Sequence, residues 1–178
     1  MIFLLGGESH TGKTLLAQKL LEKFSYPYLS LDHLKMGLIK GMKNFPFKVD
    51  EDEKIAEFLF PIVDGIIQTC IENKQNLIIE GIYLTPKKLK KFQNHSDVKI
   101  LYIIFSKEYI LQNYALIYQN ENAIEKRLFS EKEEINTLIL NHQKLKSQCE
   151  NLNLPFIEIQ KDYEAELKNA IDFLPKSK

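Results

Sequence analysis

The sequence has little of what several protein classes need. It has only two cysteines, Cys70 and Cys149, with no CxxC spacing, which excludes a disulfide framework and a cysteine zinc site. We expect both to be free, buried thiols. Basic and acidic residues number 24 each, so the formal net charge is zero. A protein that binds nucleic acid through bulk positive charge is therefore not expected.

Long hydrophobic runs are also missing. No apolar run approaches the roughly 20 residues that cross a bilayer, so no membrane association is expected. The first residues are apolar with no preceding basic segment, which argues against a secretion signal. The 178 residues, 44% hydrophobic and 27% charged, suffice for one sizeable core. We expect a single cytoplasmic domain over residues 1–178.

Short apolar segments alternate with helical patterns along the chain. Strands are predicted at residues 2–5, 28–31, 77–79, 99–105 and 155–159. Helices are predicted at residues 12–24, 34–40, 50–73, 107–118, 122–129, 131–151 and 163–173. Pro61 is expected to kink or split the third of them. The alternation predicts an α/β fold in which helices cover both faces of a parallel sheet, joined by right-handed crossovers.

A glycine-containing loop follows the first predicted strand. Residues 7–14 match the pattern GxxxxGK[ST] in full, between a strand and a helix. The glycines let backbone N–H groups point into one concavity, and the helix adds its positive end. In this phosphate loop, Lys13 would reach the β and γ phosphates of a nucleoside triphosphate, and Thr14 would offer its hydroxyl to Mg²⁺. The expected nucleotide-binding residues are Gly7, Glu8, Ser9, His10, Thr11, Gly12, Lys13 and Thr14. We expect the His10 side chain to face solvent.

The motifs of other phosphate-loop classes are absent. No glycine has an aspartate three residues before it and no NKxD occurs, which argues against a GTPase. A hydrophobic run ending in Asp-Glu, typical of large ATPase motors, is missing too. A small phosphotransfer enzyme is the class that best fits this length.

Charged residues follow the second predicted strand, at the edge where ligands bind in such sheets. Asp32 is predicted to face the phosphate loop and to take or orient the proton of an acceptor hydroxyl. Lys35, one helical turn later, could clamp an anionic acceptor. Alternatively, Asp32 only caps the helix predicted at residues 34–40.

The third predicted strand leads into Glu80. Three apolar residues followed by an acid resemble a Walker-B pattern, with Glu in place of the commoner Asp. Glu80 could hold Mg²⁺ through water or hydrogen-bond the acceptor. The alternative is a carboxylate that simply ends a strand.

Arginine is scarce, since Arg127 is the only one among 24 basic residues. Its planar guanidinium suits phosphoryl oxygens better than an ammonium does. It belongs to a lid-like segment predicted near residues 107–130, which would close over the nucleotide. A surface ion pair with Glu125 or Glu131 is the alternative.

Three stretches, GGESHTGKT, LSLDHLKMGLI and LIIEGIYLTP, resemble small P-loop kinases of the nucleoside-monophosphate-kinase-like group. The likeness is greatest to bacterial 2-phosphoglycerate-kinase-like or adenylate-kinase-like ATP-binding proteins, with zeta-toxin kinases as more distant relatives. It implies a three-layer α/β/α fold, strand order 2-3-1-4-5, and ATP with Mg²⁺. It also implies that Asp32 is the base or hydroxyl anchor, that Lys35 binds the acceptor, and that Arg127 stabilises the transferring phosphoryl group. A single arginine argues against ordinary adenylate kinase activity.

The sequence therefore predicts an ATP-dependent kinase that moves the γ-phosphoryl group to a hydroxyl or phosphate of a small molecule. The acceptor is expected near residues 32–75, beside Asp32, Lys35 and Glu80. A phosphorylated sugar, a nucleotide and a glycerate fit equally well. One alternative is a zeta-toxin-like kinase of a nucleotide sugar. Another is a nucleotide-binding regulator with little turnover. Besides the small-molecule acceptor, the expected partner is a second copy of the chain or a small protein regulator.

Overall fold

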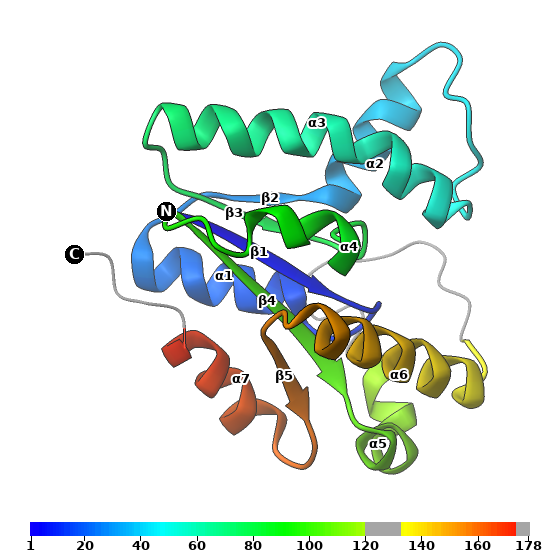
Figure 1. Ribbon diagram of the computed structural model, residues 1–178. Helices are drawn as coiled ribbons and strands as arrows, with labels where there is room; N and C mark the ends of the chain where they lie inside the picture. Colours follow the sequence, from blue (N-terminus) through cyan, green and yellow to red (C-terminus); the bar gives the residue numbers. More distant parts are fainter. Residues whose placement is uncertain (120–132, 174–178) are drawn as a thin grey trace.

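The structure, a computed structural model, describes residues 1–119 and 133–173 (Figure 1). Its strands form one sheet in the order β2-β3-β1-β4-β5, and every neighbouring pair is parallel. The strands are β1 (Ile2–Gly7), β2 (Tyr28–Ser30), β3 (Leu77–Glu80), β4 (Val98–Phe105) and β5 (Phe156–Ile159). The predicted α/β fold and strand order are both confirmed.

The described helices follow the predicted pattern with shifted ends. They are α1 (Lys13–Phe24), α2 (Leu31–Gly41), α3 (Asp52–Glu72), α4 (Pro86–Leu89), η1 (Lys90–Phe92), α5 (Lys107–Gln119), α6 (Ile135–Leu152) and α7 (Tyr163–Phe173). The short helices α4 and η1 were not predicted. The helix predicted at 122–129, the start of the one predicted at 131–151, and Arg127 lie outside the described residues.

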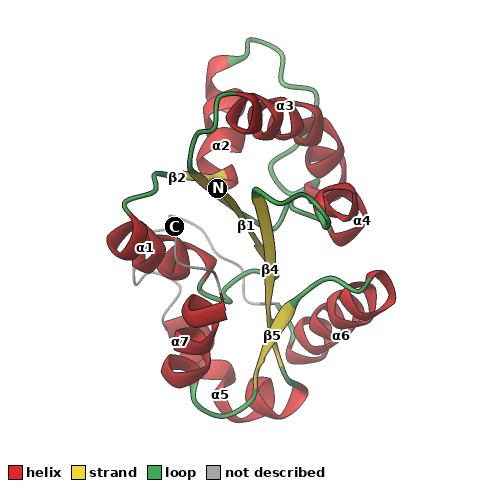
Figure 2. Cartoon of the chain, turned by 60° about the vertical axis from the view of Figure 1, so that its left-hand side comes forward, coloured by secondary structure: helices red, strands yellow, loops and turns green. Residues whose placement is uncertain are grey.

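Both faces of the sheet are covered, which gives the predicted three layers (Figures 1 and 2). Alternate residues of β1 pack into the hydrophobic cores on the two faces of the sheet. Ile2 and Leu4 pack with α3, whereas Phe3 and Leu5 pack with α1 and α7. A strand buried on both faces needs a continuous apolar run, and this explains why the first segment shows no polar alternation. Because β1 packs on both of its faces, it lies at the centre of the sheet. The phosphate loop follows directly after its carboxyl end.

Helix α3 differs from the expectation at its proline. Pro61 lies inside a helix that runs unbroken from Asp52 to Glu72, so the predicted split does not occur. The face of α3 that packs on the sheet carries Ile55, Leu59, Val63 and Ile67, all of which are buried on both sides of the proline. The packing of this continuous apolar stripe on the sheet stabilises the helix, although Pro61 cannot donate a backbone hydrogen bond.

Both cysteines are free and buried, as predicted. Burial raises the pKa of the Cys149 thiol to about 12, which keeps it protonated and unreactive at neutral pH. None of the helices in the described ranges has the length and apolar character that crossing a membrane requires.

Candidate active site

The phosphate loop connects β1 to α1 and has the curled backbone that its sequence predicts. Gly7, His10 and Gly12 all have positive φ, at 147°, 64° and 81°. The buried Thr11 hydroxyl donates to the Glu8 carbonyl oxygen at 2.9 Å and fixes the curl from inside. Successive turns of this kind direct backbone N–H groups into one concavity, which is an anion-binding arrangement.

Lys13 begins α1 and lies over the loop. Its side chain is buried, and its Nζ donates to the Glu8 carbonyl oxygen at 2.6 Å and to Thr11 Oγ1 at 3.4 Å. The first turn of α1 contains no acidic residue, so nothing there opposes the positive end of the helix. The loop therefore combines an ammonium with a helix N-terminus, which suits a phosphate group.

Glu80 and Thr14 meet beside this loop. The sheet register pairs Leu5 of β1 with Glu80 of β3, which brings the carboxylate next to the strand that leads into the loop. The Thr14 hydroxyl donates to Glu80 Oε1 at 3.4 Å, and Glu80 is only 2% exposed. Hydroxyl and carboxylate oxygens are the hard ligands that Mg²⁺ prefers, so this pair fits the ion.

The Glu8 carboxyl belongs to the same region. Burial raises its pKa above the usual value, although the Lys13 ammonium opposes the shift.

Asp32 and Lys35 both lie on α2, but the local structure differs from the prediction. Helix α2 begins at Leu31, directly after β2, so Asp32 lies in its first turn and Ser30 occupies the N-cap position. The idea that Asp32 caps a helix at residues 34–40 is therefore wrong. Leu31 was predicted to end the strand. Its side chain is fully buried in the core next to Gly81, and a leucine buried there is compatible with the start of a helix as well as with the end of a strand.

Lys35 joins α2 to α3. Its side chain is 11% exposed, and its Nζ lies 3.7 Å from Asp52 Oδ1 and 4.0 Å from Asp32 Oδ1. Tyr83, in the loop after β3, donates its hydroxyl to the same Asp52 oxygen at 2.8 Å, and the Lys35 ammonium lies 5.2 Å from the centre of the Tyr83 ring. Asp52 and Tyr83 come close to Lys35 only through the fold, so no spacing pattern in the sequence indicates these contacts.

Two aromatic contacts to the phosphate loop were also missed. The Tyr163 hydroxyl of α7 donates to the Thr11 carbonyl oxygen at 3.3 Å, close above Gly12. The His10 ring, expected to face solvent, is half-buried and lies 4.8 Å from the Tyr118 ring of α5. These contacts attach the loop to two helices that are distant in the sequence, and no spacing pattern could have shown them.

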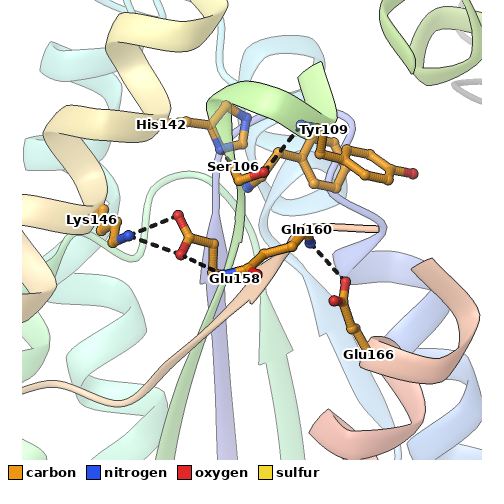
Figure 3. A network of polar contacts seen from close by, with 8 residues as sticks. Ser106, Tyr109, His142, Lys146, Glu158, Gln160 and Glu166 are labelled. Carbon is orange, nitrogen blue, oxygen red and sulfur yellow. Dashed lines mark hydrogen bonds and ion pairs between the residues drawn. The ribbon is translucent and has the colours of Figure 1, made fainter. Parts of the chain in front are cut away.

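A polar network ties α6 to the sheet next to the site (Figure 3). The Lys146 ammonium donates to both oxygens of Glu158 on β5 at 2.8 Å. His142 is 1% exposed, and its Nδ1 accepts the Phe105 N–H at 3.0 Å. Burial and, to a lesser degree, the Lys13 charge lower its pKa to about 3, so the ring is neutral. These contacts tie α6 to β4 and β5, and the neutral histidine adds no positive charge to the core.

Comparisons with known proteins bear on the fold of the chain. The chain matches no protein-family model and no curated protein. Among solved structures, shikimate kinase from Aquifex aeolicus vf5 aligns with a TM-score of 0.57 at 16% identity, covering 97% of this chain and 95% of that chain. Deoxyadenosine kinase from M. mycoides aligns with a TM-score of 0.55 at 13% identity, over 97% and 98%. A gluconokinase from Sinorhizobium meliloti 1021 aligns with a TM-score of 0.51 at 11% identity, over 96% and 89%.

At these identities the likeness concerns the fold. The protein has the α/β fold of P-loop NTPases, in the form seen in small-molecule kinases.

Proposed function

We propose that the protein is an ATP-dependent phosphotransferase that acts on a small molecule. The observation that carries the proposal is the contact between Thr14 and Glu80 at 3.4 Å, beside a phosphate loop with a buried lysine. A phosphate-binding loop alone fits any anion, whereas this hydroxyl–carboxylate pair adds a place for the metal that accompanies a nucleoside triphosphate.

The residues have distinct roles on the ATP side, at the metal and on the acceptor side. The backbone N–H groups of residues 7–14 and the Lys13 ammonium bind the phosphates of ATP. Thr14 and Glu80 hold Mg²⁺, which when bound neutralises charge on the phosphate oxygens. Asp32 and Lys35 lie on the acceptor side. Arg127, as the lid arginine that stabilises the transferring group, remains part of the proposal although it lies outside the described residues.

The transfer needs one proton acceptor. Asp32 takes the proton of the acceptor hydroxyl as that oxygen bonds to the γ-phosphorus. The bond from the γ-phosphorus to the bridging oxygen breaks, and ADP leaves with that electron pair. Most of the rate enhancement comes from positioning and from the fixed positive groups of the loop, because phosphoryl transfer needs little covalent help from the protein.

An acceptor screen tests the proposal. ATP binding is measured by calorimetry with Mg²⁺, and ADP release is then followed across polyols, sugars, nucleosides, glycerate, sugar phosphates and nucleotide sugars. Lys13→Ala is expected to abolish both signals. Lys19→Ala is the matched control, since Lys19 lies on the same helix and pairs with Glu164 at the surface.

The outcomes separate the rival functions. Acceptor-dependent ADP release that Lys13→Ala removes supports the kinase, and release confined to a nucleotide sugar supports the zeta-toxin-like alternative. Tight ATP binding without release on any acceptor would contradict the kinase and favour a nucleotide-binding regulator, working through a second copy or a small protein partner.

A further inference from the structure

Tyr163 approaches the phosphate loop from a distant part of the chain. It is the first residue of α7, and its hydroxyl donates to the Thr11 carbonyl oxygen at 3.3 Å. A Cβ at Gly12 would lie 1.6 Å from the same hydroxyl, so Tyr163 occupies the space that a side chain at position 12 would fill. The glycine of the phosphate-loop motif therefore also lets the tyrosine reach the loop.

The hydrogen bond from Tyr163 fixes one peptide group of the loop. The peptide bond between Thr11 and Gly12 is trans, and in a planar trans peptide the N–H points away from the carbonyl oxygen. Because the Thr11 carbonyl oxygen faces Tyr163, the Gly12 N–H points away from Tyr163. Gly12 is the N-cap residue of α1, and backbone N–H groups at the start of a helix are the groups that bind phosphate.

The opposite orientation of this peptide is sterically open. Turning the peptide over changes φ of Gly12 from +81° to about −100°, and glycine adopts both values readily. The groups on either side are already held, since the Thr11 hydroxyl donates to the Glu8 carbonyl oxygen and the Gly12 carbonyl oxygen accepts the Leu16 N–H, each at 2.9 Å. The Thr11 carbonyl oxygen receives its hydrogen bond from Tyr163. This tyrosine therefore decides between the two orientations.

Tyr163 is well placed to keep this contact. Its ring packs edge-on against the Phe105 ring at the end of β4, with 6.4 Å between the ring centres. Burial raises the pKa of the Tyr163 hydroxyl above its usual range, so the hydroxyl keeps its proton and remains a hydrogen-bond donor.

Resting on the proposed nucleotide binding, we propose that Tyr163 is a positioning residue of the phosphate loop, whose hydroxyl holds the Thr11–Gly12 peptide so that the Gly12 N–H faces the phosphates of ATP. Without the hydroxyl, the peptide adopts both orientations, and only one of them offers this N–H to a phosphate. Phosphate binding then weakens although the hydrophobic cores that hold the fold are unchanged.

Tyr163→Phe tests the role of the hydroxyl, since it keeps the ring that packs on Phe105. We expect the Kd for ATP with Mg²⁺, measured by calorimetry, to rise about 10-fold. The Kd for inorganic pyrophosphate should rise by the same factor, because pyrophosphate has neither base nor ribose and reports on the phosphate loop alone. Tyr26→Phe is the matched control and should retain both affinities. It removes a hydroxyl from the same core, beside Phe24 at the end of α1 that is farther from the loop.

The amide signal of Gly12 gives a readout that a merely structural role would not move. In NMR spectra of the isotopically labelled wild type, we expect one Gly12 amide signal that shifts downfield when pyrophosphate binds. In Tyr163→Phe the same signal should be broadened or doubled before pyrophosphate is added, because the peptide exchanges between two orientations. Tyr26→Phe should give the wild-type spectrum at Gly12.

The outcomes separate this role from the proposed function. Equal affinities in Tyr163→Phe and the wild type, equal losses in Tyr163→Phe and Tyr26→Phe, or a Gly12 signal that Tyr163→Phe leaves unchanged would each overturn the positioning role and leave the kinase standing. A wild type that binds neither ATP nor pyrophosphate would overturn the proposed nucleotide binding, and the positioning role with it.

Discussion

The Thr14 hydroxyl donates to Glu80 across 3.4 Å although 66 residues separate the two in the sequence. If this pair holds the magnesium ion, Glu80→Gln keeps the shape and removes the charge that the ion needs. We expect the affinity for Mg²⁺ in the presence of ATP to fall about 10- to 100-fold, with little loss of stability. A magnesium titration of ATP binding measures this. An unchanged magnesium affinity would rule Glu80 out of the metal site.

Gly12 tests the geometry of the phosphate loop. Its φ is +81°, and a Cβ there would lie 1.6 Å from the Tyr163 hydroxyl. Gly12→Ala should therefore lower the free energy of unfolding by about 1–3 kcal/mol and abolish ATP binding. Gly65→Ala is the matched control, because it lies inside α3 with no atom within 4 Å of the added Cβ, and it should gain about 0.5–1 kcal/mol. Urea unfolding of the two variants compares them, and equal stabilities would contradict the prediction.

His142 should make stability depend on pH. Its folded-state pKa is about 3, against 6.5 ordinarily, because burial disfavours the charged ring. Between these values the unfolded chain binds a proton that the folded chain does not, so stability falls as the pH falls below 6.5. From pH 7 to pH 5, this site should remove about 2 kcal/mol.

The variant His142→Asn isolates that contribution. Its amide oxygen can still accept the Phe105 N–H, but it does not titrate over this range. The unfolding free energy of this variant should therefore depend less on pH than that of the wild type, whatever its absolute stability. The slope of His95→Asn, at a half-buried histidine whose Nδ1 likewise accepts a backbone N–H, is measured for comparison. Equal slopes in all three proteins would contradict the buried neutral ring.

Pro61 offers a stabilising substitution. It lies exposed within α3, where it removes one backbone hydrogen bond. Pro61→Ala should raise the free energy of unfolding by about 2 kcal/mol, the restored helix outweighing the greater freedom of the unfolded chain. Thermal or urea denaturation measures the change. An unchanged midpoint would mean that α3 has already relaxed around the proline.

The fold could be predicted because its signals are local. Apolar strands and amphipathic helices alternate, and the motif at residues 7–14 fixes where the first strand ends and the next helix begins. The ends of helices and strands were harder to predict where one residue is compatible with either structure. Leu31 is an example, since a buried leucine after a strand can end that strand or begin a helix.

The site could be predicted only in part, for a related reason. Glu80 ends β3, while Lys13, Thr14 and Asp32 lie in the first turns of the helices that follow β1 and β2, so the topology itself brings them to one edge of the sheet. The partners of these residues come from elsewhere. Asp52 and Tyr83 reach each other across 31 residues, and Tyr163 reaches Thr11 across 152, so only the packed structure pairs them.

The pairing of Leu5 with Glu80 has a consequence for how the molecule assembles. In a parallel sheet, sliding β3 by one residue would turn the carboxylate to the opposite side and place an isoleucine or a glycine where it stood. A chain misaligned in this way could bury nearly as much apolar surface, yet it would have no acid beside Thr14. On the proposed function, metal-dependent nucleotide binding would require correct strand alignment, and a refolding experiment could use it to tell native molecules from compact, slipped ones.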